Sequence, residues 1–233
     1  ASELIELLTL LLASERPVET VSCAWALTAA IAADRHGDSS DLMRLATDRL
    51  LAGQSTSGLF PHLLPAEAGG WGRAHIGCFA DQVYPIQALA RFAIATGDQR
   101  FLKAANACAD RICAVQGSAG QWWWHYDVRN GGVVEGYPVY SVHQHAMAPM
   151  ALLELWEAGG SDHWAAVQRG LSWLDRHPES ATPLIAERDG VIWRKIGRRE
   201  PPKAVRSISA FTTGLQPGLH VPGLDLVFPP GRV

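Results

Sequence analysis

The sequence has no long hydrophobic run and no excess of positive charge. Its longest apolar stretch, residues 7–13, is interrupted by Thr9 and falls far short of the ~20 residues that span a bilayer. Lys and Arg number 20 against 23 Asp and Glu, whereas a surface that binds nucleic acid is markedly basic. These absences predict a soluble protein whose partners include neither a membrane nor a nucleic acid.

Cysteine is also scarce. The four cysteines, Cys23, Cys78, Cys108 and Cys113, lack the spacing of metal ligands, and the last two lie within a helical pattern. We interpret them as small apolar residues of a protein in a reducing compartment. The sequence therefore predicts a cytoplasmic protein without a bound metal or other cofactor.

What the sequence does contain is an internal repeat. The segments "DRLLAGQSTSGLF" at 48–60 and "DRICAVQGSAGQW" at 110–122 share Asp-Arg, an aliphatic residue, Gln, Gly and an aromatic residue at identical spacing. A second pair, "VYPIQAL" at 83–89 and "MAPMALL" at 147–153, places a proline at the head of an apolar run. Repetition of this kind indicates stacked supersecondary units.

Each unit has the pattern of a helical hairpin. Residues 84–95 are apolar or small at almost every position, which is typical of an inner helix buried on most sides. Residues 100–115 and 162–176 mix charged and apolar residues, as expected of outer helices. The other predicted helices are 3–13, 18–34, 40–53, one that begins near 148 and a short one at 204–212. The sequence thus predicts an all-α fold.

Inner and outer hairpins joined by loops rich in glycine and aromatic residues resemble the α/α toroid. This fold is shared by six-hairpin glycosidases, polysaccharide lyases and epimerases, and terpenoid cyclases. The segments "QSTSGLF" and "QGSAGQW" are also similar to the Q-x-x-x-G-x-W motif of the cyclases. The resemblance covers about residues 18–176 and implies a partial toroid, because three hairpins are visible where a full ring has six. A homo-oligomer or another partner would complete such a ring.

The C-terminal part of the chain has a different composition. It turns basic at "WRKIGRREPPKAVR", residues 193–206, and becomes rich in proline and glycine after residue 213. Such a segment lacks helical periodicity. We therefore predict a toroid-like domain over residues 1–213 and a tail over residues 214–233.

In a toroid, the loops that lead into the inner helices converge on one end of the ring. The corresponding loops are residues 69–82 and 122–145, and they concentrate aromatic, histidine, arginine and acidic side chains. The candidate site residues are Trp71, Arg73, Asp81, Trp123, Trp124, His125, Tyr126, Asp127, Arg129, Glu135, Tyr137, Tyr140, His143 and His145.

The first hypothesis is glycoside hydrolysis on an oligosaccharide or polysaccharide. This reaction needs one protonated and one ionised carboxyl group, and the pair would be Asp127 with Asp81 or Glu135. Trp123 and Trp124 have no aromatic counterpart in the first repeat, so they are the candidates for stacking on sugar rings. The competing interpretation is that each acid merely caps a helix or a turn.

The alternatives belong to other classes. Tyr140, His143 and His145 suit proton abstraction from a uronic acid, as in a lyase or epimerase, with Arg73 or Arg129 neutralising the substrate carboxylate. His143 and His145 would bind zinc with His125 or Asp127 only if the segment were extended. A terpenoid-cyclase-like protein and a non-catalytic helical binding scaffold also remain, although no acid-rich cyclase motif is present.

Overall fold

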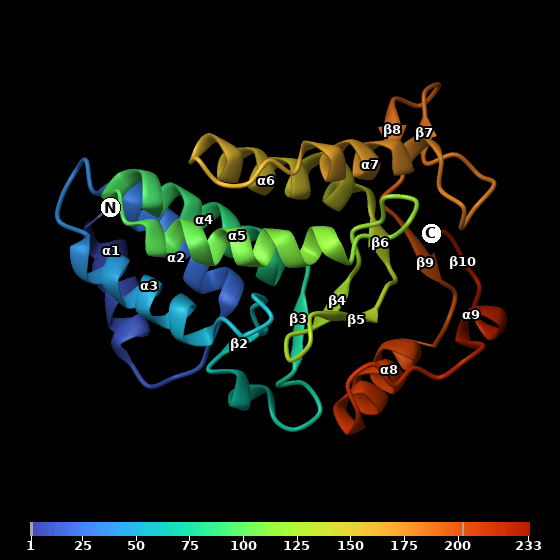
Figure 1. Cartoon of the computed structure of the whole chain (residues 1–233), viewed down its shortest axis with the longest axis horizontal. Coiled ribbons are helices and arrows are strands. Elements are labelled where there is room, and N and C mark those ends of the chain that lie inside the picture. The colour runs from blue at the N-terminus through green and yellow to red at the C-terminus, as the bar shows by residue number, and fades with distance from the viewer. Residues whose placement is uncertain (1, 202) are drawn as a thin grey trace.

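Three helical hairpins form the body of the protein (Figure 1). We describe residues 2–201 and 203–233 of a computed structural model. The inner helices lie side by side, with α4 between α2 and α6, and each packs on its own outer helix. The hairpins are α2 (Thr20–Ala33) with α3 (Ser40–Gly53), α4 (Ala80–Thr96) with α5 (Gln99–Ala114), and α6 (Ala148–Glu157) with α7 (Trp164–Asp175). The predicted helices are thereby confirmed, as is α1 (Ser2–Ala13), which packs on α3.

Local signals explain where the central hairpin turns. Gly97 ends α4 in the left-handed conformation, at φ 72°, which glycine adopts without steric cost. Asp98 then begins α5, because its side chain accepts the Arg100 backbone N–H at 2.9 Å. The helix α4 starts at Ala80, four residues before the predicted start. Pro85 therefore lies inside the helix, so the backbone carbonyl of Asp81 receives no helical hydrogen bond.

The prediction of an all-α fold is wrong. Helices account for 53% of the structure, strands for 12%, and the strands form four small antiparallel sheets. One sheet has the order β3 (Ile76–Cys78), β4 (His125–Asp127), β5 (Gly132–Glu135), and another β10 (Pro230–Arg232), β9 (Lys195–Arg198), β6 (Val139–Tyr140). The two-stranded sheets are β1 (Val18–Glu19) with β2 (Leu63–Leu64), and β7 (Ile185–Ala186) with β8 (Val191–Ile192).

Short strands explain the error. The strands have two to four residues each, which is too few for an alternating pattern to be recognised in the sequence. The loops between hairpins, which we took for irregular segments, carry these strands. Two of the pairings are local, β4 with β5 and β7 with β8, whereas the others join segments far apart in the chain, such as Ile76 with Asp127.

One further long helix, α8 (Ala204–Leu215), lies on the β3–β4–β5 sheet (Figure 1). Its Ala210 packs with Ile76 and Val134, and His75 Nε2 lies 3.0 Å from the Thr213 hydroxyl. The shorter helices are η1 (Ala66–Gly69), the π-helix η2 (His143–Met147) and α9 (Leu224–Val227). Within residues 2–201 and 203–233, no helix combines the length and apolarity needed to cross a bilayer.

Candidate functional site

The N-terminal end of α4, the β3–β4–β5 sheet, β6, η2 and α8 meet in one region, and they bring together four of the predicted residues. Trp124 stacks almost parallel to His143, with ring centroids 5.9 Å apart and planes at 5°. Tyr140 lies 5.0 Å from Trp124 and 5.1 Å from His143, and His125 lies 5.2 Å from Trp124. Arg206 of α8 covers the Trp124 ring at 5.4 Å. We call these five residues the aromatic–histidine cluster.

Hydrogen bonding inside this cluster is incomplete. Within the described part of the chain, four of its buried polar atoms have no partner: Trp124 Nε1, His125 Nδ1, His143 Nδ1 and Arg206 Nε. The Trp122 backbone carbonyl lies near the His143 ring and slightly favours its protonated form, but the geometry is not that of a hydrogen bond. Because buried polar groups in folded proteins nearly always have partners, four unsatisfied atoms in one place make this cluster the candidate functional site.

Both imidazoles of the cluster are neutral at pH 7. Burial lowers the pKa of His143 to about 3. Burial, and then the charges of Arg206 and Arg73, hold the pKa of His125 well below its ordinary value. His143 also belongs to the π-helix η2 between β6 and α6, and single π turns are frequent at functional sites. A neutral imidazole has the free lone pair that a general base uses, and an anionic substrate beside it would raise its pKa toward the operating pH.

Cations surround the cluster. Besides Arg206, Arg194 and Lys195 lie over the Tyr140 ring, at 5.4 and 5.9 Å. These three residues come from the basic segment after residue 192, outside the two loops that we expected to carry the site. Basic composition was the only sequence signal for them, and nothing in it indicated that β9 and α8 bring them to the loop aromatics.

Two of the three predicted carboxylates are engaged by arginine. Asp127 is 2% exposed and accepts two hydrogen bonds from the Arg129 guanidinium, at 2.9 and 2.7 Å. Glu135 is paired with Arg198 and also accepts from the Ser209 hydroxyl and the Tyr137 backbone N–H. An arginine partner stabilises the ionised form, whereas a general acid must hold a proton.

The third carboxylate has no arginine partner among the described residues. Asp81 is fully buried and accepts the Cys78 backbone N–H at 2.7 Å. His62 Nδ1 lies 3.2 Å from Oδ2, the same oxygen that accepts the Cys78 N–H, and this hydrogen bond raises the pKa of His62. Cys78 pairs with His125 between β3 and β4, so Asp81 lies beside the aromatic–histidine cluster. His62 precedes both predicted loops and was not expected at the site.

The other predicted residues lie elsewhere. Tyr126 is fully buried in the helical core, and His145 is exposed. Trp71 is 62% exposed and packs edge-on against Phe211 of α8, and Arg73 is exposed on the same loop. Because His143 is buried and His145 is exposed, the structure does not bring this pair together as metal ligands.

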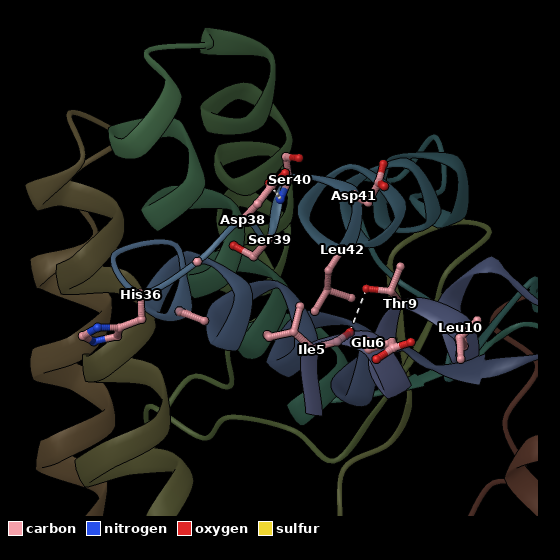
Figure 2. Close-up of a pocket in the computed structure, with 12 residues that line it drawn as sticks. Ile5, Glu6, Thr9, Leu10, His36, Asp38, Ser39, Ser40, Asp41 and Leu42 are labelled. Atoms are coloured by element: carbon pink, nitrogen blue, oxygen red, sulfur yellow. Dashed lines mark hydrogen bonds between the residues drawn. The ribbon is translucent and has the colours of Figure 1, made fainter. Parts of the chain in front are cut away.

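One pocket borders these elements and another lies far from them. The first, of about 500 Å³, is lined by Trp123, Glu135, Tyr137 and Arg198 together with the loop at 220–225. The second, of about 340 Å³, lies between α1 and the turn from α2 to α3 (Figure 2). Its polar side chains satisfy local backbone groups, as when Asp38 accepts the Ser40 N–H at 2.9 Å. It is remote from β6 and α8 (Figure 1), and its lining of helix ends offers no convergent set of reactive groups.

Comparison with known proteins finds a structure of similar fold but no matching family. No family model matches the chain, and no curated protein matches it in sequence. Among solved structures, an alpha-amylase from Clostridium perfringens is similar, with a TM-score of 0.51 and 13% sequence identity. The similarity covers 88% of this chain and 56% of the amylase chain. At this identity the similarity concerns the fold, and this chain spans little more than half of the longer protein.

Proposed function

We propose that the protein is a carbohydrate-active enzyme that abstracts a proton from a uronic acid, as a lyase or an epimerase. The observation that carries the proposal is the unpartnered Nδ1 of neutral His143, held against Tyr140 and Trp124 beneath Arg206. Rings suit the faces of a sugar, and arginine suits a carboxylate. The cations around Tyr140 favour an acidic glycan over a neutral one.

In this mechanism His143 is the general base. Arg206 or Arg194 neutralises the uronate carboxylate, which makes the hydrogen on the adjacent carbon more acidic. His143 takes that proton. In a lyase the carbon–oxygen bond to the leaving sugar then breaks as a carbon–carbon double bond forms, and the Tyr140 hydroxyl protonates the leaving oxygen. In an epimerase Tyr140 instead returns a proton to the opposite face of the ring.

The proposal requires movement at α8. His143 is 4% exposed, and the Arg206 side chain lies over Trp124. Substrate therefore has to displace the Arg206 side chain from the Trp124 indole and stack on the indole in its place. The carboxylate of a uronic acid would supply the partner that Arg206 Nε lacks. Binding of the substrate would thereby also uncover the Trp124 ring.

The test is a panel of polyuronates, in which absorbance of the unsaturated product reports a lyase and exchange of the ring hydrogen with deuterated water reports an epimerase. His143→Ala should lower turnover by ~10²–10⁴-fold, the usual contribution of a general base. The control is Asp127→Asn. This variant should lower the melting temperature, because it weakens the pairing of Arg129, while turnover persists. Full activity of His143→Ala would overturn the proposal.

A second candidate is glycoside hydrolysis, and the fold similarity favours it, because the solved structure is named an alpha-amylase. Asp127 would then act with Asp81 or Glu135, after the arginine partners had moved away. New reducing ends without the absorbance of an unsaturated product would support this candidate. Asp127→Asn rather than His143→Ala would then be the inactive variant. Membership of the α/α-toroid superfamily stays a prediction.

A further inference from the structure

Three side chains with metal-binding atoms converge at the start of α4, outside the proposed mechanism. His62, Cys78 and Asp81 each offer one ligand atom, and these atoms all lie within 4.8 Å of one another. In the described part of the chain no other group of three or more His, Cys, Asp or Glu side chains meets this condition. The residues come from the segment before β2, the end of β3 and the first turn of α4, so only the tertiary fold brings them together.

The three donors match one metal in particular. Nitrogen, thiolate sulfur and carboxylate oxygen are the protein ligands of Zn²⁺, at about 2.0–2.3 Å from the ion. Tetrahedral ligands at such lengths are themselves about 3–4 Å apart, close to the 3.2 Å between His62 Nδ1 and Asp81 Oδ2. Three protein ligands also leave one position of the tetrahedron for water or another molecule.

A second observation concerns the other nitrogen of the same imidazole. Glu19 Oε1 lies 3.9 Å from His62 Nε2, on the side of the ring that faces away from Asp81. Histidine ligands of metals regularly donate their second ring N–H to a carboxylate, which fixes the tautomer and makes the ligand more basic. The Cys78 backbone N–H likewise orients the Asp81 carboxylate, at 2.7 Å. Glu19 thus lies within ion-pair distance of His62, and a backbone N–H holds the Asp81 carboxylate.

We propose that His62, Cys78 and Asp81 form a zinc site with one open coordination position. Binding replaces the thiol proton of Cys78 by the metal, and the proton goes to solvent. Without a cation this thiol stays protonated, because burial and the Asp81 charge raise its pKa. Since Cys78 pairs with His125, the site borders the aromatic–histidine cluster, but the proposal does not depend on the proposed function.

The experiment uses the full chain after treatment with a chelator, with Zn²⁺ and Co²⁺ as probes. We expect one equivalent of Zn²⁺ to bind in competition with a chromophoric chelator. Co²⁺ should give a thiolate-to-metal charge-transfer band in the near ultraviolet and the strong visible bands of a tetrahedral ion. Absence of the charge-transfer band from the wild-type protein would overturn the proposal.

Matched variants locate the site. Cys78→Ser should lose the charge-transfer band, whereas Cys113→Ser, at the other half-buried cysteine, should keep it. His62→Ala, at a side chain that is 43% exposed and therefore tolerant of substitution, should weaken Zn²⁺ binding by more than tenfold. Glu19→Gln should weaken it about tenfold, as loss of a carboxylate behind a ligand does. Equal affinity of the wild type and a folded His62→Ala variant would refute the assignment.

Discussion

The two Gln–Gly turns, residues 54–60 and 116–122, have nearly the same structure. Gln54 Nε2 donates to the carbonyls of Gly58 and Ala104, both at 2.8 Å. Gln116 Nε2 donates to the carbonyls of Gly120 and Ala166, both at 3.0 Å. Each glutamine therefore closes its own turn and ties it to the outer helix of the next hairpin. The aromatic residue that ends each turn is fully buried.

The chain diverges immediately after the turns. The first turn leads to Pro61 and His62, and His62 contacts Asp81. The second leads to Trp123 and Trp124, which lie on two different sides: Trp123 lines the 500 Å³ pocket and Trp124 stacks on His143. The comparison teaches that the repeated residues hold the hairpins together, while the unrepeated residues that follow them belong to the two proposed sites.

The largest effect is expected at the glycines of the two turns. Gly58 and Gly120 have φ of 89° and 103°, and a Cβ at either would overlap a carbonyl oxygen of the next outer helix, that of Ala107 or Arg169. Gly58→Val and Gly120→Val should each lower the free energy of unfolding by about 3 kcal/mol or more, from backbone strain and steric overlap together. Thermal and urea denaturation measure the loss.

Gly132→Val is the control for this pair. Gly132 lacks a positive φ, and a Cβ there would meet the end of the Asn130 side chain at 3.1 Å, which can rotate away. We expect a small loss. If Gly120→Val and Gly132→Val had equal melting temperatures, the equivalence of the two turns would lose its support.

An intermediate effect is expected at the glutamines. Gln54→Leu and Gln116→Leu each remove two hydrogen bonds and leave part-buried carbonyls without a partner, which costs about 1–3 kcal/mol. Gln116 Oε1 also accepts from Arg169 at 2.8 Å, but that contact is exposed and adds little. The two losses, measured by urea denaturation, should agree to within ~0.5 kcal/mol. A much larger loss at one site would show that the turns differ in function.

The smallest effect at pH 7 is a pH dependence of stability that comes from His143, which stacks on Trp124 just after the second turn. The pKa of His143 falls from its ordinary 6.5 to about 3 in the folded protein, so the unfolded chain binds the proton more tightly. The stability that depends on a neutral His143 is complete above pH 6.5. It is lost as the pH falls toward 3, at ~1.4 kcal/mol per pH unit. Stability measured at pH 7 and pH 5 should fall less in His143→Gln than in the wild type. The exposed-residue control His36→Gln should retain the wild-type slope, and identical slopes for all three proteins would contradict the burial of a neutral His143.

The hairpins could be predicted from the sequence because their signals are local. The boundaries of α3, residues 40–53, agree with the predicted ones, since helical periodicity and the start of a helix at Ser40 are encoded within a few turns. The glycine shared by the two repeated segments is Gly58 or Gly120, and both have a positive φ in the structure. The all-α assignment failed for two reasons. The pairing of β3 with β4 joins distant segments and has no local pattern, and the local hairpin of β4 and β5 has strands of only three and four residues.

The sequence by itself determined the three hairpins, the two Gln–Gly turns and the concentration of aromatic and histidine residues in the loop at 122–145. Only the tertiary structure decided which of those residues meet. In the sequence, Asp127 and Glu135 are equally plausible as catalytic acids, but the structure pairs them with Arg129 and Arg198. His143 remains without a partner for its Nδ1 among the described residues. The physical reason is that a side chain's charge state depends on burial and on neighbours within a few ångströms, and the fold brings such neighbours from distant parts of the chain, as it brings Arg198 to Glu135 across 63 residues.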